Sequence, residues 1–109
     1  MSNRIYKINL EKDRPIINLL GEICWGFHVD NFEKKIGVKK EIAEALLDRL
    51  LREEKLGIIE TQLNDFEVEI LKKALCEVER EIEEWEFHAR IGVNLEEVKE
   101  MAIFKNLSQ

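Results

Sequence analysis

The chain is poor in the residues that build catalytic nucleophiles and irregular loops. Its 109 residues include two serines, one threonine and one proline. Ser2 and Ser108 lie beside the chain ends and Thr61 is alone, so a hydroxyl nucleophile with an oriented base is hard to place. The sequence also has no glycine-rich phosphate loop. We therefore expect a protein that is not an enzyme.

The two cysteines lie too far apart for a Cys-x-x-Cys motif. Cys24 and Cys76 each fall in an apolar helical pattern, which predicts buried free thiols in a reducing compartment, with a disulfide as the alternative. Cys24 with His28, and Glu84 with His88, have the i, i+4 spacing of metal ligands on one helical face. A structural zinc site takes four ligands, so we expect no metal ion or other cofactor.

Long hydrophobic runs are absent as well. No apolar stretch approaches the about 20 residues of a membrane-spanning helix, and the opening MSNRIYKINLEKDR lacks the apolar region of a signal peptide. We expect a cytoplasmic protein with no membrane partner. The length fits a single domain over residues 1–109, which would bury roughly two-thirds of the surface of its unfolded chain.

Apolar spacing predicts a mainly α-helical domain with a minor two-stranded β ribbon. Residues 4–10 and 58–63 alternate, which is typical of half-buried strands that pair with each other. Shorter helices are predicted over 13–25, 30–36, 38–55 and 95–106. The 38–55 helix is expected to bury Ile42, Leu46, Leu47, Leu50 and Leu51. The last helix is expected to turn inward Val98, Met101, Ala102 and Leu107.

Several residues fit helix ends. Asp13 is a predicted N-cap, with Pro15 in the first turn after it. Asp30 and Glu33 have capping-box spacing. Glycine is favoured where a helix ends in the left-handed conformation, and the predicted helix ends coincide with Gly26, Gly37, Gly57 and Gly92.

The strongest periodic signal predicts one long helix over residues 64–91. Leu63 and Val68 form a hydrophobic staple around an Asn64–Glu67 capping box, a device that Val93, Asn94, Glu97 and Val98 repeat. An apolar seam follows at spacings of three and four residues: Leu71, Leu75, Val78, Ile82, Trp85 and Ala89. A straight helix of this length would measure roughly 40 Å, so one end is expected to protrude or to carry shorter elements.

Negative charge is concentrated in the second half of the chain. Residues 1–60 hold 11 acidic and 11 basic side chains, whereas residues 61–109 hold 12 and 6, which accounts for the net charge of −6. Two glutamate rows flank the predicted seam: Glu77, Glu81 and Glu84, and Glu79, Glu83 and Glu86. They are either a solvated face or a docking surface for a basic partner, with an exposed Trp85 or Trp25 as its aromatic anchor.

Two segments, GEICWGFHVDNFEKKIG and EIEEWEFHARIGVNLEEVKEM, in a small acidic chain resemble bacterial immunity proteins that accompany contact-dependent growth inhibition and other polymorphic toxins. The resemblance implies a non-enzymatic protein that binds a cognate toxin, commonly a basic nuclease, and covers its active site. The charge pattern predicts the contact residues: Glu77, Glu79, Glu81, Glu83, Glu84, Glu86 and Trp85.

A second, local resemblance gives the alternative function. The stretch NFEKKIGVKKEIAEALLDRL followed by GIIE is similar to the helix-turn-helix and first wing strand of bacterial winged-helix regulators. Gly37 falls at the turn, and the inward positions of the recognition helix would be Ala43, Leu47 and Leu50. The resemblance implies a DNA-binding transcription regulator that uses residues 30–60, with Lys39 and Lys40 reaching the DNA.

Overall fold

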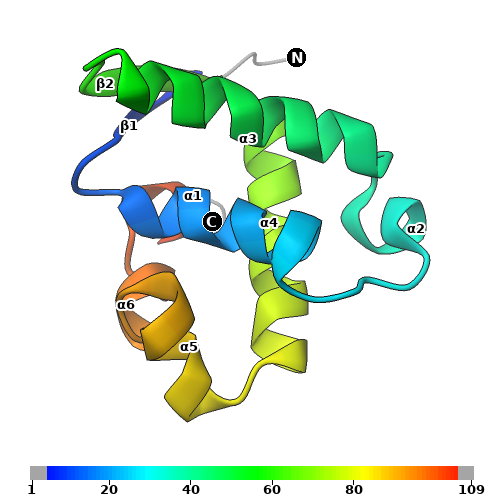
Figure 1. The fold of residues 1–109 in the computed structure, drawn as a ribbon. Coiled ribbons are helices and arrows are strands. Elements are labelled where there is room, and N and C mark those ends of the chain that lie inside the picture. Colours follow the sequence, from blue (N-terminus) through cyan, green and yellow to red (C-terminus); the bar gives the residue numbers. More distant parts are fainter. Residues whose placement is uncertain (1–4, 106–109) are drawn as a thin grey trace.

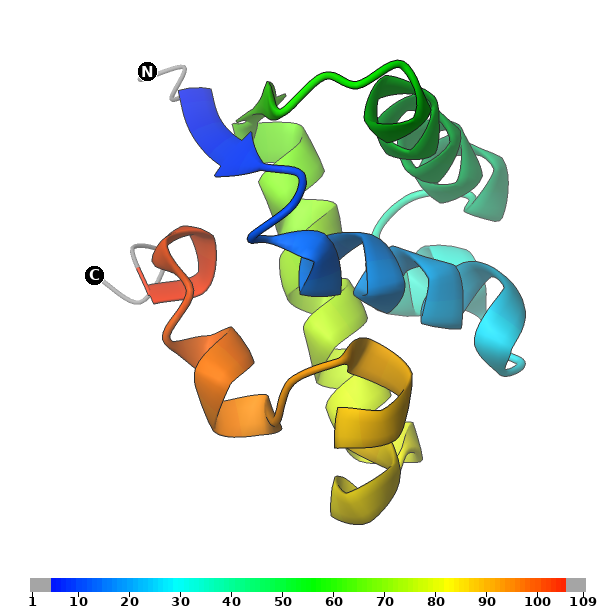
Figure 2. The same cartoon turned by 60° about the vertical axis from the view of Figure 1, so that its left-hand side comes forward.

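The computed structural model describes residues 5–105 and shows a mainly helical fold with one small antiparallel sheet. The elements are, in order, β1 (Ile5–Asn9), α1 (Arg14–Gly21), a π-helical turn η1 (Glu22–Gly26), α2 (Phe32–Ile36), α3 (Lys40–Lys55), β2 (Glu60–Asn64), α4 (Asp65–Glu81), α5 (Glu84–Ile91), α6 (Leu95–Lys99) and α7 (Ala102–Lys105). Helix α4 runs through the middle of the molecule (Figures 1 and 2) and contacts β1, β2, α1, η1, α2 and α5.

The predicted ribbon is confirmed. β1 and β2 pair antiparallel, from Ile5 opposite Asn64 to Asn9 opposite Glu60. The inward-facing apolar side chains of this region are buried: Ile8, Leu10 and Leu63. Arg4, which the prediction included, lies outside the described residues. Since β2 ends at Asn64 and α4 begins at the next residue, no second wing strand lies between them.

Two of the four predicted N-cap side chains act as expected. The Asn64 Oδ1 accepts from the Glu67 backbone N–H at 2.8 Å, and the Glu67 carboxylate accepts from the Asn64 N–H at 2.9 Å. Asn94 similarly accepts from the Glu97 N–H. Asp13 does not cap α1, because its carboxylate accepts from the Asn9 N–H and closes the turn after β1.

The predicted cap of α2 is also wrong. Asn31, with a left-handed φ of 54°, occupies the N-cap position one residue after Asp30, and no side chain caps this helix. At its other end Gly37 adopts the expected left-handed conformation, with a φ of 91°. Helix α2 packs on α4, so tertiary contacts position this short helix without a side-chain cap.

The burial of two apolar residues differs from the prediction. Cys24 is buried and Cys76 is exposed, and both thiols are free. Cys76 follows the buried Leu75 on α4 and points away from the core. Ile42 is exposed on α3, where it lines a shallow surface groove with Phe66. The rest of the predicted α3 face is buried, with Leu51 half-buried.

The single long helix predicted over residues 64–91 is wrong. The chain forms α4 and α5, separated by Ile82 and Glu83, and the backbone of both residues is extended, with φ −113° and ψ 132° at Ile82. The seam is buried as predicted as far as this break. Beyond it Trp85 and Ala89 are exposed, whereas Phe87 and Ile91 are buried in their place.

Packing and charge both favour the break. The described residues span 32 × 30 × 27 Å, less than the roughly 40 Å of an unbroken helix. By turning at Ile82 the chain lays α5 against α1 and α4 and buries Phe87 and Ile91, which stabilises the fold by about 1.5–3 kcal/mol for each side chain. The turn also places Glu84 and Glu86 in the first turn of a helix, where negative charge is favourable.

The C-terminal helix is also shorter than predicted. It divides into α6 and α7 around Glu100 and Met101. Val98 is buried and Met101 is half-buried, as expected. Leu107 lies outside the described residues. Across residues 5–105, no helix is both long and apolar enough to cross a membrane.

Candidate functional site

The turn between α4 and α5 gathers exposed carboxylates around an exposed tryptophan. Trp85 is 73% exposed, and its indole Nε1 donates to the Glu83 carboxylate at 3.3 Å. Glu81, at the end of α4, and Glu84, at the start of α5, are exposed as well. We call these four residues, Glu81, Glu83, Glu84 and Trp85, the α4–α5 tip.

The other three predicted contact residues lie apart from the tip or are already paired. Glu77 is only 4% exposed and forms an ion pair with Arg80 at 3.2 Å. Glu79 pairs with Lys99, and Glu86 pairs with Arg90 on its own helix. The break at Ile82 therefore divides both predicted rows, and the six glutamates do not form two continuous lines.

The tip carries negative charge that the rest of the described chain leaves unneutralised. Within residues 5–105, the carboxylates of Glu81 and Glu84 have no hydrogen bond or ion pair, and the Glu83 carboxylate accepts only from the Trp85 indole. Glu83 and Glu84 stand at the N-terminal end of α5, where the helix dipole stabilises their charge. The dipole thus lowers the cost of holding these carboxylates close together.

Trp85 differs from an ordinary surface residue in what surrounds it. Large aromatic side chains bury apolar area when they can, and tryptophan is enriched among residues that dominate interface energies. Here the ring lies in solvent, and its N–H is held by Glu83 at 3.3 Å. The hydrogen bond restricts the orientations that the exposed ring can adopt.

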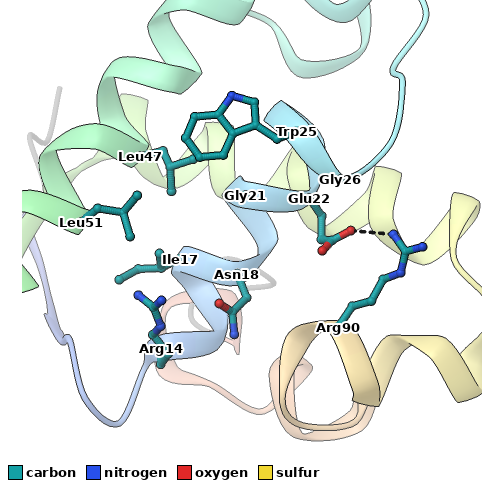
Figure 3. A pocket seen from close by; sticks show the side chains of 10 residues that line it. All are labelled: Arg14, Ile17, Asn18, Gly21, Glu22, Trp25, Gly26, Leu47, Leu51 and Arg90. Carbon is teal, nitrogen blue, oxygen red and sulfur yellow. Dashed lines mark hydrogen bonds and ion pairs between the residues drawn. The ribbon is translucent and has the colours of Figure 1, made fainter.

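A second feature is a cleft of about 330 Å³ between α1, η1, α3 and α5. Figure 3 shows Arg14 and Arg90 on opposite sides with Asn18 between them. The apolar side chains lie between Arg14 and Trp25: Ile17, Leu47 and Leu51. The complete lining consists of Arg14, Ile17, Asn18, Gly21, Glu22, Trp25, Gly26, Leu47, Leu51 and Arg90. We call this the Trp25 cleft. Its volume lies at the lower end of the range for ligand pockets.

Both arginines of the cleft are held by carboxylates. The Arg14 Nη1 donates to both oxygens of Glu54 at 2.8 and 2.9 Å. The Arg90 Nη1 donates to Glu22 at 2.9 Å (dashed in Figure 3), and its Nη2 lies 3.2 Å from Glu86. The hydrogen bond that Arg90 donates to Glu22 is the main cause that raises the pKa of Arg90 above its ordinary value. These pairs fix the sides of the cleft.

Trp25 is 61% exposed, and its indole Nε1 donates to the Glu44 carboxylate of α3 at 3.3 Å. Its neighbour Cys24 points the other way, into the core. Burial, followed by the negative charge of Glu44, raises the pKa of the Cys24 thiol from 9.0 to about 11. Both tryptophans of the chain thus lie at the surface, each with its N–H held by a glutamate.

Neither predicted metal-ligand pair extends to a site. The helical turn η1 ends at Gly26, so Cys24 and His28 do not share a helical face. Cys24 is buried, whereas His28 is exposed, with its Nε2 2.9 Å from the Asp30 Oδ1. Glu84 and His88 are both exposed on α5. Among residues 5–105, no group of three or more His, Cys, Asp or Glu side chains is placed to hold a metal ion.

The residues of the alternative function, 30–60, include α2 and α3. Lys39 and Lys40 are exposed at the start of α3, and Lys34 is exposed on α2. No side chain caps the first turn of α3. Gly37 stands at the turn between the helices, as expected, and the three expected inward residues are buried: Ala43, Leu47 and Leu50.

The sequence patterns point to the tip but not to the cleft, whose lining comes from four separate elements. One local signal exists. Gly21 stands inside a continuous helical stretch, where glycine is unfavourable, and it lines the cleft.

Comparisons with protein-family models, with curated proteins and with solved structures find no match to this chain. Function is therefore inferred from the chemistry of these two surfaces.

Proposed function

We propose that this protein is a non-enzymatic inhibitor of the immunity-protein class. It binds a basic protein toxin, of which a nuclease is the favoured kind, and covers the active site of that toxin with its acidic α4–α5 tip. The observation that carries the proposal is an exposed Trp85 among carboxylates that have no cation partner within residues 5–105. On this proposal the protein works in the cytoplasm, where its toxin would act.

Charge supports a basic partner. A local excess of negative charge speeds the encounter with a positive surface and selects against acidic proteins. A nuclease presents such a surface because it binds phosphates, and carboxylates on a protein can occupy the same positions. The exposed glutamates of the tip would then supply association rate and specificity, while burial of the Trp85 ring would supply most of the affinity.

The direct test uses the product of the gene immediately upstream of this one. If that gene encodes a secreted toxin, its toxic domain should arrest growth when expressed alone, and this protein should restore growth and form a complex with it. An upstream gene with no toxin would count heavily against the proposal. Growth arrest that persists beside well-folded protein would refute it for that toxin.

Two pairs of charge reversals locate the surface. Glu81→Lys with Glu84→Lys should slow association and make binding more sensitive to salt. Glu41→Lys with Glu69→Lys changes the net charge equally at exposed sites on other parts of the molecule and should have a much smaller effect. Equal effects would show that net charge acts and the tip does not.

Trp85→Ala tests the anchor. If the ring is buried at the centre of the interface, its removal should weaken binding by about 2 kcal/mol or more, or roughly 30-fold. Trp85→Phe should retain part of the affinity, because it keeps an aromatic ring but loses the indole N–H. Unchanged affinity in Trp85→Ala would exclude the ring from the contact.

The second candidate is a DNA-binding regulator that uses residues 30–60. It is favoured by the exposed Lys39 and Lys40 at the uncapped start of α3. Binding to duplex DNA, measured by fluorescence anisotropy at about 50 mM salt, where phosphate contacts are strongest, should fall when both lysines become alanine. Absence of binding under these conditions would remove this candidate.

A further inference from the structure

The Trp25 cleft is an open hollow with an exposed aromatic side chain on one wall. We propose that it takes an arginine side chain of the basic partner, with the guanidinium stacked on the Trp25 indole and the methylene groups along the apolar floor. The proposal rests on the proposed function in one respect, that the partner is a basic protein. It adds a second contact surface, separate from the α4–α5 tip.

The floor of the cleft is apolar and has spare room. Ile17 and Leu47 are packed into the core and show only an edge to the cleft. A Cβ added at Gly21 would meet no atom within 4 Å, and the backbone there is ordinary right-handed helix, with φ −60° and ψ −39°. A glycine at such a position costs about 0.5–1 kcal/mol relative to alanine. No contact within the described chain requires it, whereas an external group lying over the floor would use the space.

The charge around Trp25 favours a cation. Glu44 holds the indole N–H, and Asp48 stands one helical turn further along α3. Within the described residues neither carboxylate has an ion pair, whereas Arg14 and Arg90 are already neutralised by their own carboxylates. The negative charges of Glu44 and Asp48 both act on the neighbouring Cys24 thiol, opposed by Lys40. Neither carboxylate lines the cleft itself, so their charge lies beside its Trp25 wall, where it favours a cation over an anion.

Arginine fits the site better than other cations. A guanidinium is planar and weakly hydrated, so it stacks on an aromatic face while its N–H groups reach carboxylates at the ring edge. The hydrogen bond from the indole N–H to Glu44, at 3.3 Å, places a carboxylate at the edge of the Trp25 ring. A long methylene stem can also cover apolar surface while its charged end stays near water.

The experiment uses the whole protein and two small probes, N-acetyl-arginine amide and its neutral isostere N-acetyl-citrulline amide. The chain has two tryptophans, so an NMR spectrum contains two indole N–H signals, which Trp85→Phe assigns. The arginine probe should shift the Trp25 signal to saturation, with about two- to fivefold higher affinity than the citrulline probe, as expected for a cation–π contact at an exposed site. Salt at about 1 M should reduce this difference, since the Debye length is then about 3 Å.

Variants separate the contributions. Glu44→Gln with Asp48→Asn should remove most of the preference for arginine, and Gly21→Leu should weaken both probes by filling the floor. Glu69→Gln, an exposed carboxylate elsewhere, is the control and should change nothing. Equal affinity for the two probes, or a Trp25 signal that does not move, would overturn the proposal.

The two proposals can fail separately. Failure of the cleft leaves the Trp25 signal still and leaves the effects of the α4–α5 tip variants on toxin binding intact. Failure of the proposed function leaves the toxin unbound while the arginine probe still shifts the Trp25 signal.

Discussion

Replacing Gly21 by alanine should stabilise the free protein. The backbone of Gly21 is right-handed helix and a new methyl group would meet nothing within 4 Å, so the substitution adds helix propensity without strain. The expected gain in the free energy of unfolding is about 0.5–1 kcal/mol. For a domain of this size that raises the melting temperature by about 2–8 °C.

Gly92→Ala is the matched control, because it adds the same methyl group at a position that also has space. The nearest atom to a Cβ at Gly92 would be Asn18 Nδ2 at 3.8 Å, an ordinary contact, but the φ of 101° is left-handed. The methyl group should therefore destabilise the fold by about 1–2 kcal/mol through the backbone alone. The two substitutions differ in backbone conformation and should have opposite signs.

Thermal and urea unfolding, followed by circular dichroism, measure both differences. The urea dependence of the unfolding free energy should stay the same in all three proteins, which shows that stability alone has changed. A destabilised Gly21→Ala would refute the inference that the space over Gly21 is open in the folded protein. An unaffected Gly92→Ala would mean that α5 does not end in the left-handed conformation.

Two further predictions concern the thiols and the tryptophan at the tip. In the native protein an alkylating reagent at about pH 8, near the ordinary pKa of cysteine, should modify the exposed Cys76. It should spare Cys24, because this thiol is buried and its pKa is raised to about 11. Both cysteines should react after denaturation. Because the pKa of Cys24 is raised in the folded state, its contribution to stability should be complete below pH 9.0 and be lost as the pH rises through about 11, a slope that Cys24→Ala should remove. Trp85→Ala should change the free energy of unfolding by less than about 0.5 kcal/mol, whereas Phe87→Ala should lower it by about 3–5 kcal/mol. A larger loss of stability in Trp85→Ala than in Phe87→Ala would show that Trp85 is the buried ring.

The features that the sequence predicted correctly depend on neighbouring residues. The capping box of Asn64 and Glu67 is a contact over three positions, and the seam of Leu71, Leu75 and Val78 lies on one face of one helix. Strand alternation at Ile8 and Leu63 is similarly local. Such patterns keep their meaning whatever the rest of the chain does, so they can be interpreted without tertiary information.

The break at Ile82 could not be predicted in this way. No glycine or proline marks it, and the helical spacing of apolar residues continues through Trp85 and Ala89. Phe87 and Ile91 form a competing pair at i, i+4 spacing, out of register with the seam. Contact with α1 decides between the two, including the hydrogen bond from Asn18 Nδ2 to the Ile91 carbonyl at 2.7 Å. That contact joins residues 73 positions apart.

The two candidate surfaces differ in the same way: one follows from a local pattern and the other depends on tertiary contacts. The tip follows from a run of glutamates in one segment, although the predicted rows differ from the structure in three ways. Glu77 is buried, Glu79 and Glu86 are paired with cations, and the break at Ile82 divides both rows. The Trp25 cleft requires Arg14, Glu22, Leu47 and Arg90 to meet, and no local spacing predicts such a meeting. The exposure of both tryptophans likewise depends on which neighbouring helices cover them.

Asn64 belongs to two elements at once, and this has a consequence for how the protein unfolds. It is the last residue of β2, opposite Ile5, and the N-cap of α4. Arg49 of α3 binds the same junction, through the Glu67 carboxylate at 2.8 Å and the Gln62 carbonyl at 3.0 Å. A one-residue slip of the ribbon would therefore displace the start of the central helix and turn the buried face of β2 outward. The ribbon and the first turn of α4 should accordingly open as one cooperative unit, and their amide protons should exchange with solvent at a common rate.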